Sequence, residues 1–177
     1  MKRSPPAQRQ VISNAGPHIH LAKANALHIL QSLYQTVLIP EEVKAETVDK
    51  GKEKGHSDAL QIENAIQQGW IETIQVRLDP DFQKAAKTAG LRNAEALVTQ
   101  HAYQNHLIAL LDDEPARIFA KTLGVTIRGT LGILIQAAKS RIMDLQEAIQ
   151  TLDKLAETMY ISADLYKTTR KEIDKLA

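Results

Sequence analysis

The sequence predicts an α/β protein with a parallel sheet that carries helices on both faces. The segment 107–113, LIALLDD, is the most apolar run of the chain, which is typical of a strand covered on both sides in the middle of such a sheet. The helix-like segment EPARIFAKTLG follows it at once. Elsewhere, short apolar segments alternate with helical stripes, and this alternation favours right-handed crossovers between parallel strands.

The composition indicates one globular domain. A chain of 177 residues with 44% hydrophobic residues can bury a sizeable core. Its 22 basic and 21 acidic residues nearly balance, so any affinity for nucleic acid has to come from local clustering of charge. The absence of cysteine excludes disulfides, thiolate metal sites and a cysteine nucleophile. No apolar stretch approaches the ~20 residues that cross a bilayer, so we expect a cytoplasmic protein without membrane contact.

The first half of the chain contains two strand-helix units. Residues 1–10 are polar and are expected to form a flexible lead-in. A short strand at 11–12 then ends in the turn-forming SNAGP, and a helical stripe runs over 19–34. A second strand at 36–39 leads into a helix opened by Pro40. We expect the charged segment DKGKEKGH that follows to be a solvated loop, with RNA contact as the alternative.

The second half continues the alternation. Gly69 and Gly90 are expected to end two helices on either side of an edge strand at 70–76. Asn93 can cap the next helix, which precedes LIALLDD. A fifth strand at 125–128 and the helical GTLGILIQAAKS come after it. From Asp144 onward the pattern is helical, and these tail helices either cover the core or form a dimer contact.

Polar residues are expected to meet at one edge of the sheet. Parallel strands bring their carboxyl ends together, which places Asn14 near Asp112 and Asp113. Glu46 and Glu95 belong to helices that start at the same edge. Clustered carboxylates repel one another unless a divalent ion neutralises them, and hard oxygen ligands suit Mg²⁺ or Mn²⁺. A metal held there can activate water and stabilise a phosphoryl transition state, as metal-dependent nucleases require.

Each acid also has a purely structural interpretation. Asp113 can cap the helix that follows it, Glu95 can stabilise the positive end of its own helix, and Glu46 can pair with Lys50. His18 and His20 lie two positions apart on a helix, which is a poor spacing for a metal and favours surface histidines. Basic side chains flank the predicted edge and can meet phosphates, although isolated surface charges are commoner: Lys44, Arg92, Arg117, Lys121 and Arg128.

Five motifs, in order, resemble a known family. VISNAGPHIHLAKANALHILQSLY, VLIPEEVKAE, NAEALVTQHA, LIALLDDEPARIFAKTLGV and RGTLGIL are similar to PIN-domain-like proteins related to VapC toxins. The similarity runs from about residue 11 to residue 134, and the tail helices also resemble that subgroup. It implies a three-layer α/β/α sandwich with a five-stranded parallel sheet, formed by a PIN-like domain at 11–141 with a helical extension at 142–177 packed on it.

The resemblance also implies a function and a set of residues. It implies Mg²⁺-dependent cleavage of RNA, a small antitoxin protein as partner and, by analogy, a homodimer. The acids of the family fall on Glu46, Glu95 and Asp113, with Asn14 at the position of the first acid. Asparagine offers a carbonyl oxygen but no negative charge, which lowers metal affinity. The alternative is therefore a catalytically weakened PIN-like protein that binds nucleic acid or an antitoxin.

Overall fold

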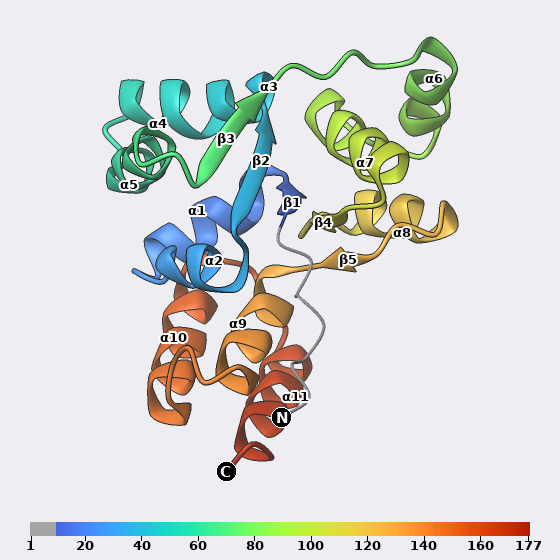
Figure 1. Ribbon diagram of the computed structural model, residues 1–177. Helices are drawn as coiled ribbons and strands as arrows, with labels where there is room; N and C mark the ends of the chain where they lie inside the picture. The colour runs from blue at the N-terminus through green and yellow to red at the C-terminus, as the bar shows by residue number, and fades with distance from the viewer. Residues whose placement is uncertain (1–9) are drawn as a thin grey trace, which may run out of the picture.

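Five parallel strands form the sheet at the centre of the computed structural model, which describes residues 10–177 (Figure 1). The strand order is β3-β2-β1-β4-β5, so the LIALLDD strand lies inside the sheet but β1 is the central strand. The predicted lead-in lies outside the described residues, except that Gln10 already belongs to β1. The strands are β1 Gln10–Ser13, β2 Thr36–Pro40, β3 Ile71–Ile74, β4 Ile108–Leu110 and β5 Ile127–Arg128.

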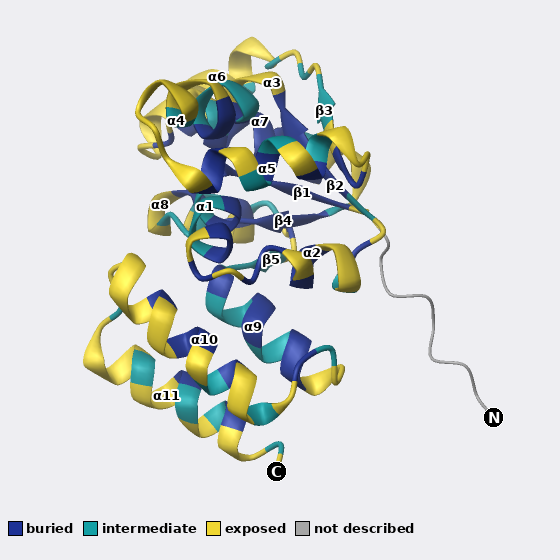
Figure 2. Ribbon diagram, turned by 90° about the vertical axis from the view of Figure 1, so that its left-hand side faces the viewer, coloured by how far each residue is buried: buried dark blue, intermediate teal, exposed yellow. Residues whose placement is uncertain are grey.

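Helices cover both faces of the sheet, which confirms the predicted three-layer sandwich (Figures 1 and 2). On one face α7 packs against β1, β2 and β4, and α6 and α8 pack against α7. On the other face α1 packs against α5, which also contacts β3. The first group is α6 Pro80–Thr88, α7 Asn93–Asn105 and α8 Glu114–Thr122. The second group is α1 Ala15–Lys23, α2 His28–Leu33 and α5 Ser57–Gln67.

The helical stripe predicted over 19–34 is two helices, because α1 ends at Lys23. Asn25 has φ 56°, a left-handed conformation that asparagine adopts more readily than most residues. The Ala26 N–H then donates to the Leu21 carbonyl over 2.8 Å, which closes a Schellman motif at the end of α1. The apolar periodicity continued through this break, so periodicity alone gave no sign of it.

The charged segment DKGKEKGH was predicted to be a loop, and this prediction was wrong for its first half. Residues 41–53 form one continuous helical stretch with a π-helical turn in the middle: α3 Glu41–Lys44, η1 Ala45–Asp49 and α4 Lys50–Glu53. A Cβ added to Gly51 would lie 2.7 Å from the Cβ of Ala59, so Gly51 lets α4 pack closely against α5. The glycine that suggested a flexible loop therefore serves a helix contact.

The C-terminal helices form a further layer beside the sandwich (Figure 2). The helix α10 packs against α9, α1 and α11. Its residues Leu152 and Leu155 are fully buried, as is Ile173 of α11. These helices therefore cover and extend the core of the same molecule, which was the first of the two alternatives for the tail helices. Their bounds are α9 Thr130–Lys139, α10 Leu145–Thr158 and α11 Ala163–Asp174. Among residues 10–177, every helix is too short or too polar to span a bilayer.

Candidate active site at the carboxyl edge of the sheet

The strand order places a topological switch point between β1 and β4, the position where open parallel sheets bind their ligands. Asn14 follows β1 directly, and Asp112 and Asp113 follow β4 after one further residue. The Asn14 N–H donates to the Leu110 carbonyl over 3.1 Å, so the two chain segments are joined at this edge. Residues almost a hundred positions apart therefore meet where the carboxyl-end rule predicts.

Asp112 joins its own segment to two others at this edge, those of His20 and Thr130. Its Oδ1 accepts the Thr130 N–H at 2.7 Å, and its Oδ2 accepts the Thr130 hydroxyl at 2.6 Å and Nδ1–H of His20 at 2.9 Å. Burial raises the pKa of Asp112, but the hydrogen bonds from His20 and Thr130 outweigh burial and hold it below its usual value. A Cβ on Gly16 would lie 3.1 Å from Oδ2, so glycine makes room for this carboxylate.

Asp113 has a capping role and one oxygen to spare. Its Oδ2 accepts the N–H of Ala116 at 3.1 Å and so caps α8. Its other carboxylate oxygen accepts no hydrogen bond within the described part of the chain. The structural interpretation of Asp113 is therefore correct, and it leaves half of the carboxylate free for a ligand.

Arg92 binds the acid of α7. The Glu95 carboxylate is 1% exposed and accepts from the backbone N–H of Arg92 at 2.8 Å and from its Nε at 2.9 Å. Arg92, and not Asn93 as the sequence suggested, is the residue before the first turn of α7. Both oxygens of Glu95 are thus engaged by one residue.

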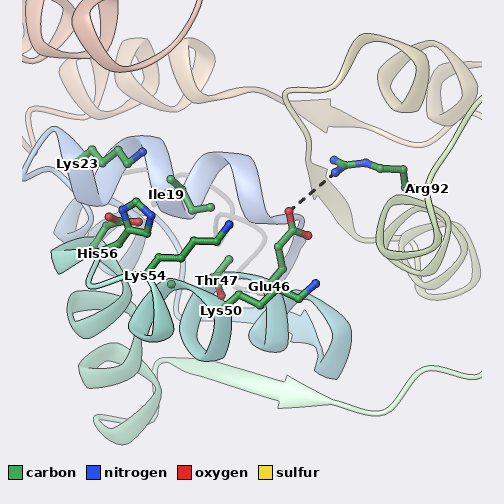
Figure 3. A pocket seen from close by; sticks show the side chains of 10 residues that line it. Ile19, Lys23, Glu46, Thr47, Lys50, Lys54, His56 and Arg92 are labelled. Atoms are coloured by element: carbon green, nitrogen blue, oxygen red, sulfur yellow. Dashed lines mark ion pairs between the residues drawn. The ribbon is translucent and has the colours of Figure 1, made fainter.

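The guanidinium of Arg92 also lies within the field of the other acids. Its Nη1 is 4.0 Å from Oε1 of Glu46, the pair drawn in Figure 3. Hydrogen bonding to Glu95 is the main cause of the raised pKa of Arg92, and the negative charges of Glu95, Glu46 and Asp113 add to it. Glu46 pairs with Arg92 and not with Lys50, the partner that helical spacing suggested. Arg92 is therefore the internal counter-ion of the acids at this edge.

We expect Arg92→Ala to lower the free energy of unfolding by about 1–3 kcal/mol, because a buried carboxylate loses charged hydrogen bonds. The value should fall near the lower end, since the Arg92 side chain is 69% exposed and water can replace part of the interaction. Urea unfolding at pH 7 measures this change. Arg170→Ala is the matched control, because Arg170 pairs with an exposed acid and should give no measurable change. Equal stability of the two variants would contradict the role given to Arg92.

A cavity of about 340 Å³ opens at the switch point. Its wall contains all the predicted site residues except Glu95, which lies behind Arg92: Asn14, Glu46, Asp112 and Asp113. Asn14 is 4% exposed, and its Oδ1 is buried without a hydrogen-bond donor among the described residues. A buried oxygen that accepts nothing is costly unless a ligand or a water completes it. The amide oxygen of Asn14 is therefore a candidate ligand atom.

Both histidines of α1 differ from their predicted surface positions. His18 is fully buried and neither ring nitrogen has a partner among the described residues. His20 lines the cavity and binds Asp112, which is 92 residues away in the chain. An ionised carboxylate only accepts hydrogen bonds, so the His20 proton lies on Nδ1. Spacing within α1 carries no signal for this contact, because it depends on how the helix packs at the sheet edge.

The donor set suits a hard divalent cation only in part. Within residues 10–177, no three His, Cys, Asp or Glu side chains are grouped so that they could hold a metal ion by themselves. Both oxygens of Asp112 and of Glu95 are already engaged. The oxygens left are the amide oxygen of Asn14, the second oxygen of Asp113 and the carboxylate of Glu46, which lies 4.0 Å from Arg92. Such a partial set suits Mg²⁺ only if waters and a substrate phosphate complete its coordination, as they commonly do where one or two carboxylates bind it.

The fold and the site define an α/β/α protein with an acid-lined cavity at the switch point of a parallel sheet. Residues 10–175 match the family model DUF3368, whose description is PIN domain. The chain therefore belongs to the PIN-domain family, which is in general a family of nucleases, and the predicted resemblance is confirmed at this level. The match includes the C-terminal helices as well as the sandwich. A search of curated proteins gave no match.

Proposed function

We propose that the chain is a metal-dependent ribonuclease of the VapC toxin type, which hydrolyses phosphodiester bonds of RNA. The single observation that carries the proposal is the cavity at the switch point, where Asn14, Glu46 and Asp113 offer oxygen atoms from three separate segments. Its place in a PIN fold supports phosphodiester chemistry over the binding of an unrelated small molecule.

Different residues of the cavity would have different roles in such a reaction. Glu46 and Asp113 would hold Mg²⁺ or Mn²⁺, with the amide oxygen of Asn14 as a neutral ligand. The bound ion supplies a Lewis acid and lowers the pKa of a water molecule. Asp112 keeps Thr130 and His20 in place around the cavity. Glu95 orients Arg92, whose guanidinium can donate to a phosphate oxygen in the cavity.

The position of Arg92 favours a second candidate function. A guanidinium among Glu46, Glu95 and Asp113 neutralises charge that would otherwise attract a cation. Together with the uncharged Asn14, it favours the alternative in which a catalytically weakened PIN domain binds nucleic acid or an antitoxin without cleaving. The two functions differ in turnover, so a cleavage assay separates them.

The test is incubation of the purified full-length chain with mixed cellular RNA in Mg²⁺, in Mn²⁺ and in EDTA. We expect cleavage with either metal and none in EDTA, because the chain alone provides no Lewis acid. Glu46→Gln should slow cleavage, since it removes one of the two carboxylates proposed to hold the metal while leaving the size of the side chain nearly unchanged. Retained RNA binding without cleavage in any metal would support the binding protein and overturn the nuclease.

A toxin of the VapC type would have two protein partners, an antitoxin and a second copy of the same chain. A toxin of this type is held inactive by a small antitoxin encoded beside it, and the chain would pair with a second copy of itself. Gel filtration of the chain alone, and of the chain expressed with the small protein encoded next to it, reports both.

A further inference from the structure

A second cavity of about 440 Å³ adjoins the candidate active site (Figure 3). The two cavities share Ile19, Glu46 and Arg92 in their walls, so they lie directly beside each other. In Figure 3, Ile19 and Lys23 extend from α1, whereas Glu46, Thr47 and Lys50 extend from η1 and α4. Arg92 reaches towards Glu46 from the segment before α7. A chain-like ligand lying in the second cavity would therefore reach the acids at the sheet edge.

The second cavity is basic. Four cationic side chains and two acids line it, and we call it the lysine groove after Lys23, Lys50 and Lys54. These three lysines are exposed and form no ion pair or hydrogen bond with any described residue. The acids are less available, because Glu46 is paired with Arg92 and Asp58 is buried. The groove thus offers free positive charge beside the site of an otherwise balanced chain.

The π-helical turn helps to build the groove. Residues four apart lie on nearly the same face of an α-helix but turn about 40° around its axis at each step, so Glu46, Lys50 and Lys54 would slowly diverge along a continuous one. A π turn takes up one more residue than an α turn and rotates the following residues back. Lys50 and Lys54 therefore stay close to the line of Glu46, and Figure 3 shows the three side chains along the same wall. Part of the segment predicted to be a loop is therefore helical, and this helix aligns Lys50 and Lys54 along the groove.

An exposed aromatic residue stands on the other side of the site. Tyr160 lies between α10 and α11 and is 96% exposed. It lines the active-site cavity and also a third cavity of about 640 Å³ beyond it. An aromatic ring that is almost wholly in water loses hydrophobic stabilisation unless a ligand covers it, and a base has a flat face suited to that. Phosphate contacts and a stacking ring thus flank the candidate site.

We propose that a single strand of RNA crosses the molecule from the lysine groove over the active site to Tyr160. Lys23, Lys50 and Lys54 would contact its phosphates, and the ring of Tyr160 would stack on one of its bases. This inference rests on the proposed function for the nature of the strand. It concerns binding, and it holds whether or not the bound strand is cleaved.

Fluorescence anisotropy with a labelled single-stranded RNA of about 16 nucleotides, in EDTA over a range of salt concentrations, tests the path. The double variant Lys50→Ala/Lys54→Ala should reduce the slope of log K against log salt by roughly 1.4, because each lost phosphate contact on a single strand removes ~0.7. Its matched control is Lys84→Ala/Lys87→Ala, two exposed lysines of α6, which should leave the slope unchanged.

The stacking contact has its own variants. Tyr160→Ala should weaken binding by about 5- to 150-fold with an unchanged salt slope, since a stacking ring carries no charge. Tyr160→Phe keeps the ring and should bind like the wild type. A duplex of the same sequence should be insensitive to Tyr160→Ala, because its bases are already stacked. All these residues are exposed, and circular dichroism confirms that each variant folds.

Three results overturn the path: no binding of RNA by the wild type, equal slopes for the Lys50/Lys54 variant and its control, or equal affinity for Tyr160→Ala and the wild type. If RNA is cleaved in Mg²⁺ while the variants bind like the wild type, only the path fails. If RNA is never cleaved but binding depends on the groove and on Tyr160, the path stands and the nuclease proposal fails.

Discussion

Lowering the pH from 7 to 4 is expected to remove about 3 kcal/mol of unfolding free energy through His18 alone. Burial lowers the pKa of His18 from 6.5 to about 4, and the negative charge of Asp112 opposes this shift without cancelling it. The folded protein therefore keeps His18 neutral, whereas the unfolded chain protonates it near 6.5. The contribution is complete above pH 6.5 and is lost as the pH falls towards 4, because ~1.4 kcal/mol is lost per pH unit.

His18→Leu should remove this pH dependence. Leucine has a similar size, and it takes two buried nitrogens without partners out of the core, so stability at pH 7 should be equal or greater. Urea unfolding at pH 7, 5.5 and 4 measures the difference between the variant and the wild type. His28→Leu is the control, because His28 is exposed on α2 and should follow the wild type. Parallel curves for wild type and His18→Leu would show that His18 is not buried in its neutral form.

His18 shows a signal that the sequence contained. It lies three and four residues before Leu21 and Ala22, which are fully buried, so the three share one face of α1. Treating the two histidines as a pair drew attention to their mutual spacing and away from the stripe to which one of them belongs. Burial of a lone histidine is predictable from its apolar neighbours at helical spacing.

The fold was predictable because its signals are local. The alternation of apolar runs with helical stripes gave the parallel sheet, and the rule on carboxyl ends brought Asn14, Asp112 and Asp113 to one edge. Arg92 was named among the basic residues near that edge, but its bond to Glu95 was not. That bond depends on side-chain direction in the first turn of α7. Sequence spacing alone does not determine whether Arg92 binds Glu95 or Glu46 more closely.

The contacts of Asp112 were out of reach for a different reason. His20 and Thr130 are far from it in the chain, and both arrive through the packing of whole helices. The π turn in residues 45–49 and the close approach of Gly51 to Ala59 likewise escaped prediction, since the charge and glycine content of this segment indicated a loop. The sequence therefore predicted which sheet edge holds the site, but it did not predict the hydrogen bonds within the site.

Asp113→Asn is expected to reduce RNA cleavage at least about 100-fold while changing the stability little. Even residues behind a metal ligand change metal affinity or activity by about 10- to 100-fold, and the loss of a charged ligand should exceed that. Asparagine caps a helix as well as aspartate does, so its side-chain oxygen can still accept the N–H of Ala116. The substitution thus removes charge from the cavity and preserves the cap, which separates the two roles of Asp113.

Asp144→Asn provides the matched control, because Asp144 caps α10 through the N–H of Glu147 and lies outside the active-site cavity. Both variants should unfold at nearly the same urea concentration as the wild type, and only Asp113→Asn should lose cleavage. If both cleave RNA like the wild type, Asp113 only caps α8 and takes no part in the chemistry. If Asp113→Asn loses stability as well as activity, the Ala116 contact requires the charge, and the activity of the folded fraction then decides between capping and catalysis.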